Sequence, residues 1–411
     1  ADARHPPSRG GLHVRDGRIV ECGEGGHPAA VHLGEVAIIP GLVNAHTHLE
    51  FSDIAEPLSP GTSFPDWIRS VISARRQRTG DVRDAIRRGW QEGVASGTRA
   101  VGEIATADES FDELRTAGGA GVVFREVLGL SDDAVARGLE TARGFLESSV
   151  APSPRPSPPQ SSDRQSKADR GGEGDSVASA LQPSLQRGLS PHAPYSLHPE
   201  LFRGLIDLAV ETGCPVAMHL AETREELELL AHGRGAMVDL LTDLGLWRPG
   251  LLSDFRRPLD YLRELSRCRR ALIIHGNYLT DVELDFLAAH PQMTVVYCPR
   301  THAFFGHAPH PWQQMRERGI RVVLGTDSRA SNPDLSIFRE LQWLHAQHPK
   351  TPVAELLRMA TCEAEEGLGP GFTPGRLISG NAATWTVIRP GGELSTDDWH
   401  HLLSGDARII A

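Results

Sequence analysis

Short apolar runs rich in β-branched residues recur along the chain, and most are followed by a segment with helical spacing. The eight runs are VAIIPGLVNAHTH (36–48), TRAVGEIAT (98–106), GVVFREVLGL (121–130), RGLSPHAPYS (187–196), PVAMHLAE (215–222), ALIIHGNYL (271–279), MTVVYCPRT (293–301) and RVVLGTDS (321–328). The segments 82–95, 132–147 and 199–213 repeat apolar residues at helical spacing between these runs. Continuous apolar strands that alternate with helices are typical of a parallel sheet covered on both faces.

Eight such units predict an α/β fold with a closed (β/α)8 barrel of the TIM type. A doubly wound open sheet is the main alternative. It is disfavoured because no glycine-rich phosphate loop follows the first strand. We expect the barrel to occupy residues 39–355.

Two regions fall outside this repeat. Residues 151–187 are rich in Pro, Ser, Gly and charged residues, so we expect a disordered insertion, with a functional lid as the alternative. Residues 1–38 and 356–411 contain the strand-and-turn segments GLHVRDGRIVECG and NAATWTVIRPGGEL, in which DG and GG mark turns. Both segments flank the barrel, so we expect them to pair in a small β domain, preceded by a helix in the C-terminal part.

Composition and charge argue against several classes of protein. The 411 residues carry a net charge of -11, which argues against a nucleic-acid partner, because such proteins present a basic face. No apolar run approaches the length of a membrane helix, and the first residues do not resemble a signal peptide. The five cysteines form no CxxC pair, which favours a reduced, cytoplasmic protein. The oligomeric state stays open, and a homo-oligomer is compatible with the sequence.

Histidines and carboxylates follow directly on several of the apolar runs. In NAHTHLEFS, His46, His48 and Glu50 are spaced by two, so a strand would turn all three to one face. One histidine at a strand end is more often a structural hydrogen-bonding group than a ligand. Active sites of such barrels, however, lie at the carboxyl ends of the strands. The residues found there are His46, His48, His192, His219, Glu222, His275 and Asp327.

This set predicts a metal site. Three imidazole nitrogens from His46, His48 and His219 and an oxygen from Asp327 suit Zn²⁺ or Fe²⁺. Such a metal lowers the pKa of a bound water towards about 7 and so makes hydroxide available. Glu222 would move a proton from that water to the leaving group. His275 would orient the hydroxide or polarise the substrate.

The lysine count indicates one metal rather than two. Related two-metal sites use a carboxylated lysine on the fourth strand as a bridging ligand. The chain has only Lys167, in the predicted insertion, and Lys350, after the last barrel helix. Neither is expected at that place.

The motifs PGLVNAHTHLE, HLAE and LGTDS resemble the amidohydrolase superfamily, in its mononuclear deaminase and chlorohydrolase branch. SPHAPYS and IIHGNYL resemble the S-adenosylhomocysteine and methylthioadenosine deaminases of that branch. HTHLEFS, FPDWI and CPRTHAFFGH are similar to aminofutalosine deaminase-like members.

The resemblance implies a β-sandwich built from both chain ends and a role for each site residue. The implied metal ligands are His46, His48, His219 and Asp327, and the implied catalytic residues are Glu222, His275 and Asp327. His192 is implied to contact the substrate. Nucleoside-type members commonly carry a ribose-binding glutamate on the first long loop. Here no acid occurs between Asp66 and Asp81, so Arg300 and His302 are expected to meet an anionic substrate instead.

The expected activity is hydrolysis of C–N bonds other than peptide bonds. A deaminase of an aminated purine-type substrate, aminofutalosine-like or adenosine-like, is the leading interpretation. A chlorohydrolase or a cyclic amide or amidine hydrolase would use the same residues. A non-catalytic barrel that serves as a binding module is a remote alternative, because such relatives generally lose metal ligands and none is missing here. The expected partner is a small molecule, and the expected cofactor is one divalent metal, zinc before iron.

Overall fold

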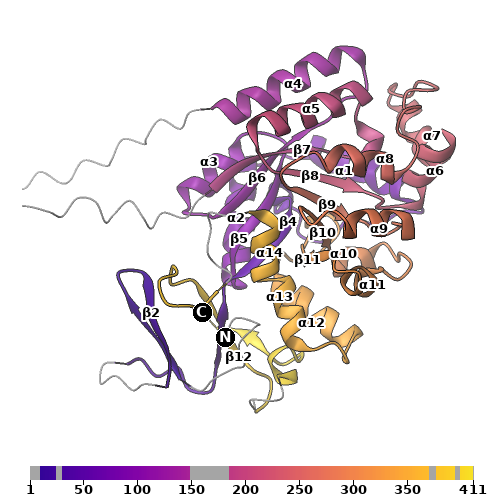
Figure 1. Ribbon diagram of the computed structural model, residues 1–411. Coiled ribbons are helices and arrows are strands. Elements are labelled where there is room, and N and C mark those ends of the chain that lie inside the picture. The colour runs from indigo at the N-terminus through magenta and orange to yellow at the C-terminus, as the bar shows by residue number, and fades with distance from the viewer. Residues whose placement is uncertain (1–9, 25–29, 149–184, 370–375, 394–398, 411) are drawn as a thin grey trace, which may run out of the picture.

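The computed structural model describes residues 10–24, 30–148, 185–369, 376–393 and 399–410 (Figure 1). Most of the chain forms a parallel barrel of eight strands. Its strands are β4 (Leu42–Thr47), β5 (Thr98–Ala105), β6 (Gly121–Val127), β7 (Leu185–Pro191), β8 (Val216–Leu220), β9 (Ala271–His275), β10 (Met293–Tyr297) and β11 (Arg321–Leu324). Each strand pairs with its neighbour in sequence. The expected α/β barrel is therefore confirmed.

The barrel closes between its first and last strands. The backbone N–H groups of Thr326 and Asp327 donate to the carbonyl of His46 at 3.0 and 3.1 Å. Gly325 permits this approach, because a Cβ at that position would lie 2.8 Å from the Cβ of His46. Closure thus joins two of the candidate ligands directly through the backbone.

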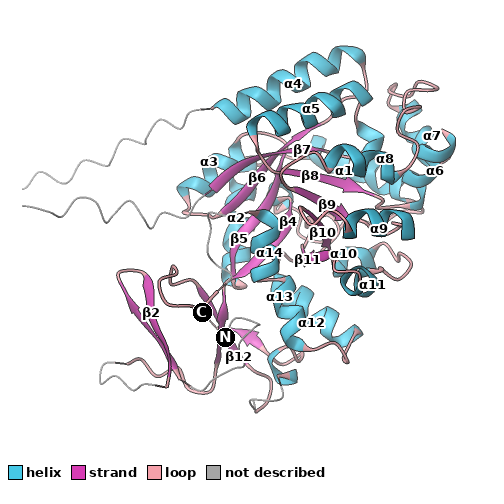
Figure 2. Cartoon of the chain, viewed as in Figure 1, coloured by secondary structure: helices cyan, strands magenta, loops and turns pink. Residues whose placement is uncertain are grey.

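Helices surround the barrel, as Figure 2 shows. They are α1 (Phe64–Gln77), α2 (Val82–Ala95), α3 (Glu109–Thr116), α4 (Asp132–Glu147), α5 (Pro199–Thr212), α6 (Arg224–His232), α7 (Ala236–Asp243), α8 (Pro258–Leu265), α9 (Asp281–Ala288), α10 (Pro299–Phe304), α11 (Trp312–Glu317), α12 (Ile337–Gln347), α13 (Val353–Met359) and α14 (Cys362–Leu368). Short 3₁₀ turns are η1 (Leu49–Phe51), η3 (Pro194–Ser196) and η4 (His400–Leu402). The predicted helices at 82–95, 132–147 and 199–213 match α2, α4 and α5 within one residue.

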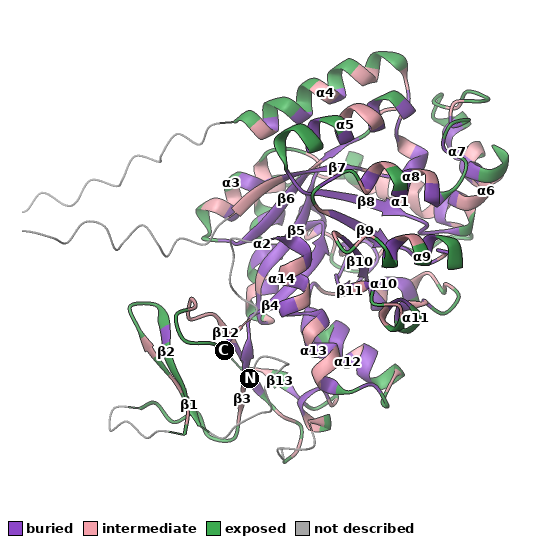
Figure 3. Ribbon diagram, in the orientation of Figure 1, coloured by how far each residue is buried: buried purple, intermediate pink, exposed green. Residues whose placement is uncertain are grey.

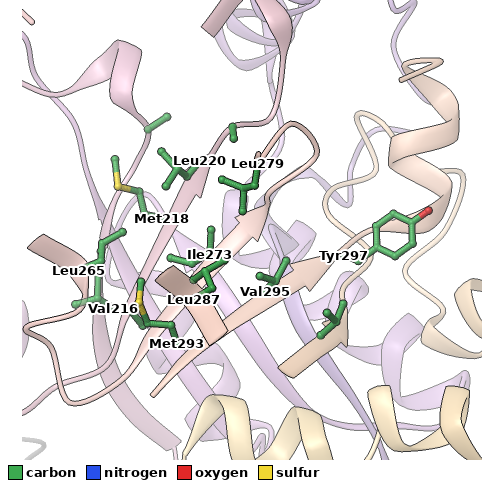
Figure 4. Packing of buried hydrophobic residues seen from close by; sticks show 14 of the residues in the cluster. Val216, Met218, Leu220, Leu265, Ile273, Leu279, Leu287, Met293, Val295 and Tyr297 are labelled. Atoms are coloured by element: carbon green, nitrogen blue, oxygen red, sulfur yellow. The ribbon is translucent and has the colours of Figure 1, made fainter. Parts of the chain in front are cut away.

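Successive residues of a barrel strand point alternately outward, to the core between strands and helices, and inward, to the core inside the barrel. Outward-facing residues such as Ile273 and Val295 pack against Leu279 and Leu287 (Figure 4). Inward-facing Leu272 and Ile274 join the apolar residues that fill the barrel. In Figure 3 the barrel strands are almost wholly buried, while the surrounding helices expose their outer faces. This distribution agrees with the continuous apolar runs of the sequence.

Helix α14 covers the amino-terminal mouth of the barrel. Its Ala364 and Leu368 pack among the interior residues, and the N–H of Val43 donates to the carbonyl of Ala360 just before α14, at 2.8 Å. The carboxyl ends of the strands, which carry the candidate site, lie at the opposite mouth.

Segments from both chain ends form two small antiparallel sheets below the barrel (Figure 1). The first sheet is the hairpin of β1 (Gly11–Arg15) and β2 (Arg18–Gly23), which turns through Asp16 and Gly17 at positive φ. In the second sheet, β12 (Trp385–Arg389) pairs with β3 (Ala37–Pro40) and with β13 (Arg408–Ile409). A small β part built from both chain ends is therefore confirmed, but the two predicted segments lie in different sheets: β12 pairs with β3, and a single bridge between Arg18 and Ala382 joins it to the hairpin.

Two boundaries differ from the sequence prediction. The run VAIIPGLVNAHTH is two strands, because β3 belongs to the small sheet and β4 begins the barrel after Gly41. The predicted insertion 151–187 lies mostly outside the described residues. Its last three residues begin β7, where Nε of Arg187 donates to the carbonyl of Phe145 at 2.7 Å and its guanidinium covers the ring of Phe111.

None of the described helices combines the length and apolar character that a membrane span requires.

Candidate active site

Four histidines and one aspartate converge at the carboxyl ends of the barrel strands. Ligand atoms of His46, His48 and His219 lie within 4.8 Å of one another, and so do those of His46, His275 and Asp327. All five side chains are buried. The structure therefore brings together all four expected metal ligands, and His275 with them.

The chemistry of these groups fits a divalent cation. Both ring nitrogens of His46 are buried, and neither has a hydrogen-bond partner among the described residues. Asp327 Oδ1 lies 3.5 Å from Nε2 of His46 and 3.7 Å from Nε2 of His48. Burial holds the pKa of His46 and of His48 well below the usual range and lowers that of His219 to about 4. These imidazoles are therefore neutral near pH 7, which is the form that binds a metal.

Neighbouring groups orient three members of the cluster. His219 Nδ1 lies 3.0 Å from the carbonyl of His192, so Nδ1 carries the proton and Nε2 is left for a ligand. Asp327 Oδ2 accepts from the hydroxyl of Ser331 at 3.0 Å. His310 Nε2 donates to the carbonyl of His275 at 2.8 Å.

The backbone is strained at this mouth of the barrel. Among the described residues, four non-glycine residues have positive φ, and three of them are Ala221, His275 and Asp327, at 54°, 69° and 59°. Such conformations cost about 1–3 kcal/mol each and gather at functional sites.

Glu222 lies beside the cluster with its carboxyl group buried. Its Oε1 is 3.4 Å from Nε2 of His275. Burial and the nearby Asp327 hold the pKa of Glu222 well above its ordinary value, which favours the protonated form of its carboxyl group. Hydrogen bonds hold the main chain at Glu222 in place.

The side-chain amide of Asn277 donates to the Glu222 carbonyl at 2.9 Å. The carboxylate of Glu226 accepts from the N–H groups of Ala221 and Glu222 at 2.8 and 3.0 Å.

His192 borders the cluster on the β6 and β7 side. Its ring centroid lies 5.0 Å from that of His219. Nδ1 shares a hydrogen bond of 2.7 Å with the hydroxyl of Ser196, and Nε2 is 3.7 Å from Oε1 of Glu126. The ring of Tyr195 lies nearly perpendicular to that of His192, with the two centroids 5.7 Å apart.

Aromatic side chains continue from Tyr195 across the loops. Phe64 and Trp67 of α1 stack at 5.4 Å, and Phe305 packs edge-on against both at 5.4 and 5.1 Å. Tyr195 lies 6.4 Å from Phe64. Ring contacts therefore run from Trp67 and Phe305 through Phe64 to Tyr195, which itself contacts His192.

The sequence comparisons identify the family. The model of the amidohydrolase family matches residues 37–397, which is most of the chain. This chain is an amidohydrolase.

Two named deaminases are similar to it over most of its length. An aminodeoxyfutalosine deaminase from Deinococcus radiodurans is 28% identical and covers 87% of this chain and 82% of its own. A 5-methylthioadenosine/S-adenosylhomocysteine deaminase from Syntrophobacter fumaroxidans is 26% identical over 92% of this chain and 80% of its own.

Solved structures share the fold. The aminofutalosine deaminase of Helicobacter pylori, in complex with methylthio-coformycin, superposes with a TM-score of 0.73 at 21% identity. The match covers 96% of this chain and 91% of that one. Atrazine chlorohydrolase from Arthrobacter aurescens, complexed with zinc, gives 0.70 at 19% identity, covering 97% and 87%.

The expected role of Arg300 as an anchor for an anionic substrate stays a prediction, and internal carboxylates compete for the same guanidinium group. Its Nη1 and Nη2 already bind Asp334 in a fork at 2.7 and 3.0 Å, and Nε lies 3.7 Å from Glu340. His302 is likewise engaged within its own loop, because Nε2 lies 2.9 Å from the carbonyl of Ala308. Carboxylates distant in sequence therefore occupy the guanidinium group that we expected to face a ligand.

Glu50 also lies apart from the ligand clusters. Strand β4 ends at Thr47, so the alternation that would align Glu50 with the histidines stops before it. Glu50 sits in η1, where its Oε2 accepts from the hydroxyl of Thr106 at 2.7 Å. The N–H of Leu49, which follows His48, donates to buried Glu103 at 3.0 Å.

Sequence reasoning missed several supporting residues, including Glu103, Glu126, Glu226, His310 and Ser331. Only Glu226 had a local signal. Thr223 and Glu226 have the spacing of a capping box, and Thr223 Oγ1 accepts from the N–H of Glu226 at 3.2 Å. The carboxylate of Glu226, however, reaches past the cap to the N–H groups of residues 221 and 222. Glu103, Glu126 and His310 depend on contacts with residues distant in sequence, whereas Ser331 contacts Asp327 four residues away without any motif that marks it.

Proposed function

We propose that this amidohydrolase is a deaminase that replaces the amino group of a purine-type ring with oxygen. The observation that carries the proposal is the buried carboxyl group of Glu222, which lies beside a cluster of neutral imidazoles. Deaminases of aminodeoxyfutalosine and of methylthioadenosine among the similar proteins support this substrate class.

In this proposal His46, His48, His219 and Asp327 hold one divalent metal. The bound metal would lower the pKa of a water molecule towards about 7. We favour zinc over iron, because zinc is bound in similar structures and three nitrogens with one oxygen suit it. A single metal is supported by β7, the fourth strand of the barrel, which carries no lysine.

Glu222 has the central catalytic role. Its raised pKa suits a group that takes up a proton and passes it to the departing nitrogen. His275, 3.4 Å away, would orient Glu222 and the reacting oxygen. Asp327, within the same ligand-atom cluster as His275, would share in this proton transfer.

The substrate would lie between His192 and the aromatic side chains of the neighbouring loops. His192 would contact the ring, and Phe64, Trp67 and Phe305 would cover its apolar part. Neither Arg300 nor His302 has a role in this proposal, because both groups bind other parts of the chain.

An amine is a more fitting leaving group than chloride. Nitrogen must gain a proton before it departs, whereas chloride leaves as an anion. A buried carboxyl group whose pKa lies well above its ordinary value serves the first reaction as a proton donor and is not needed to protonate the leaving group of the second.

A panel assay tests the proposal. The purified, metal-loaded protein is incubated with aminodeoxyfutalosine, methylthioadenosine, S-adenosylhomocysteine, adenosine and atrazine, and ammonia and chloride release are both measured. We expect ammonia from at least one aminopurine nucleoside. Chloride release from atrazine without ammonia from any nucleoside would refute a deaminase.

A further inference from the structure

The loop that follows α10 carries a histidine, His307, that the mechanism above does not use. Its Nδ1 lies 3.1 Å from the hydroxyl of Tyr278, while its Nε2 is buried and has no hydrogen-bond partner among the described residues. A buried polar nitrogen in this state is costly unless a ligand or a water molecule supplies the missing partner. The residue as a whole is only partly buried, so Nε2 points into the protein rather than towards solvent.

Tyr278 decides which ring nitrogen of His307 carries the proton. Burial lowers the pKa of His307 to about 4, so its ring is neutral near pH 7 and holds one N–H group. Because an imidazole nitrogen is a better acceptor than a phenol oxygen, the hydroxyl of Tyr278 donates to Nδ1 and the proton stays on Nε2. The guanidinium group of Arg224 lies 4.9 Å from the centre of the Tyr278 ring and helps to hold the phenol in place. His307 therefore presents a buried N–H group that lacks an acceptor.

His307 lies between the reacting groups and the aromatic side chains of the loops. On one side, the N–H of Tyr278 donates to the carbonyl of Ala221 at 3.1 Å, and His307 is close enough to His275 to influence it electrostatically. On the other side, the ring of His307 lies 5.6 Å from that of Phe305, which packs against the aromatic side chains of α1. His307 therefore borders the space that the proposed substrate would occupy.

Burial indicates which part of the substrate His307 would meet. Glu222 and His275 are buried, whereas His307 is partly exposed, so His307 lies nearer to solvent than the reacting groups. A nucleoside whose amino group meets Glu222 directs the 5′ end of its sugar away from the reacting groups. Gly306 and Ala308 on either side of His307 are exposed, so the loop can shift to admit a ligand atom beside Nε2.

An uncharged oxygen suits this N–H group. A carboxylate buried beside Nε2 would need a compensating charge, and the neutral ring of His307 supplies none. A hydroxyl or ether oxygen accepts one hydrogen bond from an N–H group without that cost.

We propose that Nε2 of His307 donates a hydrogen bond to an uncharged oxygen of the 5′ substituent of the substrate, and so favours a nucleoside that carries oxygen there. This inference rests on the proposed function and deepens it, because it names a residue that selects among aminopurine nucleosides. The amino group meets Glu222, and the opposite end of the nucleoside meets His307.

The experiment compares 5′-O-methyladenosine with the counterpart in which a CH₂ group replaces the ether oxygen. The two compounds have nearly the same shape, and the ether oxygen can only accept a hydrogen bond. In the wild-type protein, kcat/KM for the ether should exceed that for the CH₂ compound by about 2- to 10-fold, the effect of one hydrogen bond between neutral groups. In His307→Phe and in His307→Ala this ratio should approach one. Metal content and circular dichroism verify that each variant is folded.

His290→Phe is the matched control. His290 follows α9 and precedes β10, at the end of the barrel opposite the site. Its Nδ1 lies 2.6 Å from the carbonyl of Phe286, and its ring stacks on that of Phe286 at 4.0 Å. This variant should keep the wild-type ratio.

The outcomes separate this inference from the proposed function. If the wild-type protein releases ammonia from no aminopurine nucleoside, the proposed function fails and this inference falls with it. If the protein is a deaminase but does not prefer the ether, or if the preference survives in a folded His307 variant, only this inference is overturned. An equal loss of kcat/KM for both compounds would also overturn it, since His307 would then only support the loop.

Discussion

Glu340 couples the stability of the fold to pH, and its substitution tests this link. The side chain of Glu340 on α12 is fully buried. Its oxygens accept from the amide of Asn332 at 2.7 Å and from the N–H of Arg300 at 2.9 Å. Burial nevertheless raises the pKa of Glu340 from 4.5 to about 7, against the opposing effect of the Arg300 charge. Glu340→Gln removes the titrating group and keeps its shape.

The sign and size of the effect follow from that pKa. Below pH 4.5 the folded and unfolded chains both hold the proton, so Glu340 adds no pH dependence. Between pH 4.5 and pH 7 the unfolded chain releases the proton while the folded chain keeps it, which lowers stability by about 1.4 kcal/mol per pH unit. The total loss is about 3 kcal/mol above pH 7. Glu340→Gln abolishes this loss, although it weakens the bond to Arg300 at every pH.

Urea unfolding followed by circular dichroism at pH 5 and pH 8 measures the effect. The informative quantity is the free energy of unfolding of Glu340→Gln minus that of wild type. It should rise by about 2–3 kcal/mol from pH 5 to pH 8. Metal binding acts on both proteins and cancels in this difference. Glu317→Gln, on the exposed face of α11, should follow wild type. A difference that stays constant with pH would refute the reasoning.

Three further predictions concern the site. Glu222→Gln should lower kcat by about 10²–10⁴-fold while metal content, measured by mass spectrometry, stays unchanged, and metal loss would make Glu222 a ligand instead. Wild-type protein should bind about one transition metal per chain and His46→Ala should bind almost none, so two metals at full occupancy would contradict the ligand set. Arg300→Ala should lower the free energy of unfolding by about 3–5 kcal/mol at pH 8, because it strands buried Glu340. The preference for carboxylated over uncharged substrates should not change in Arg300→Ala, and a selective rise in KM for carboxylated compounds would restore the anchor role.

The sequence was sufficient where one local pattern determined the structure. The apolar runs predicted the barrel strands, and helical spacing predicted α2 from Val82 to Ala95 without error. The clustering of the candidate ligands also followed, because parallel strands of a barrel end at one mouth. The sequence did not reveal that the first apolar run divides at Gly41 into β3 and β4, because an apolar strand has the same pattern in the small sheet and in the barrel.

Pairings between distant residues could not be predicted in the same way. An arginine after the seventh strand of the barrel has the same local pattern whether it faces a ligand or an internal acid. The partners of Arg300 in the structure are Asp334 and Glu340, which lie 34 and 40 residues further along the chain. The contact between Glu126 and His192 could not be predicted either, because the two residues lie 66 positions apart on neighbouring strand ends.

The strained residues explain why the site depends on such distant support. Ala221, His275 and Asp327 adopt positive φ without being glycine, and each conformation would relax if the surroundings allowed it. Each is fixed by a bond from elsewhere: Glu226 accepts from Ala221, His310 donates to the carbonyl of His275, and Asp327 donates to the carbonyl of His46. Local sequence preference and the final backbone therefore disagree most at residues of the candidate site, as expected where a fold gives up local stability for function.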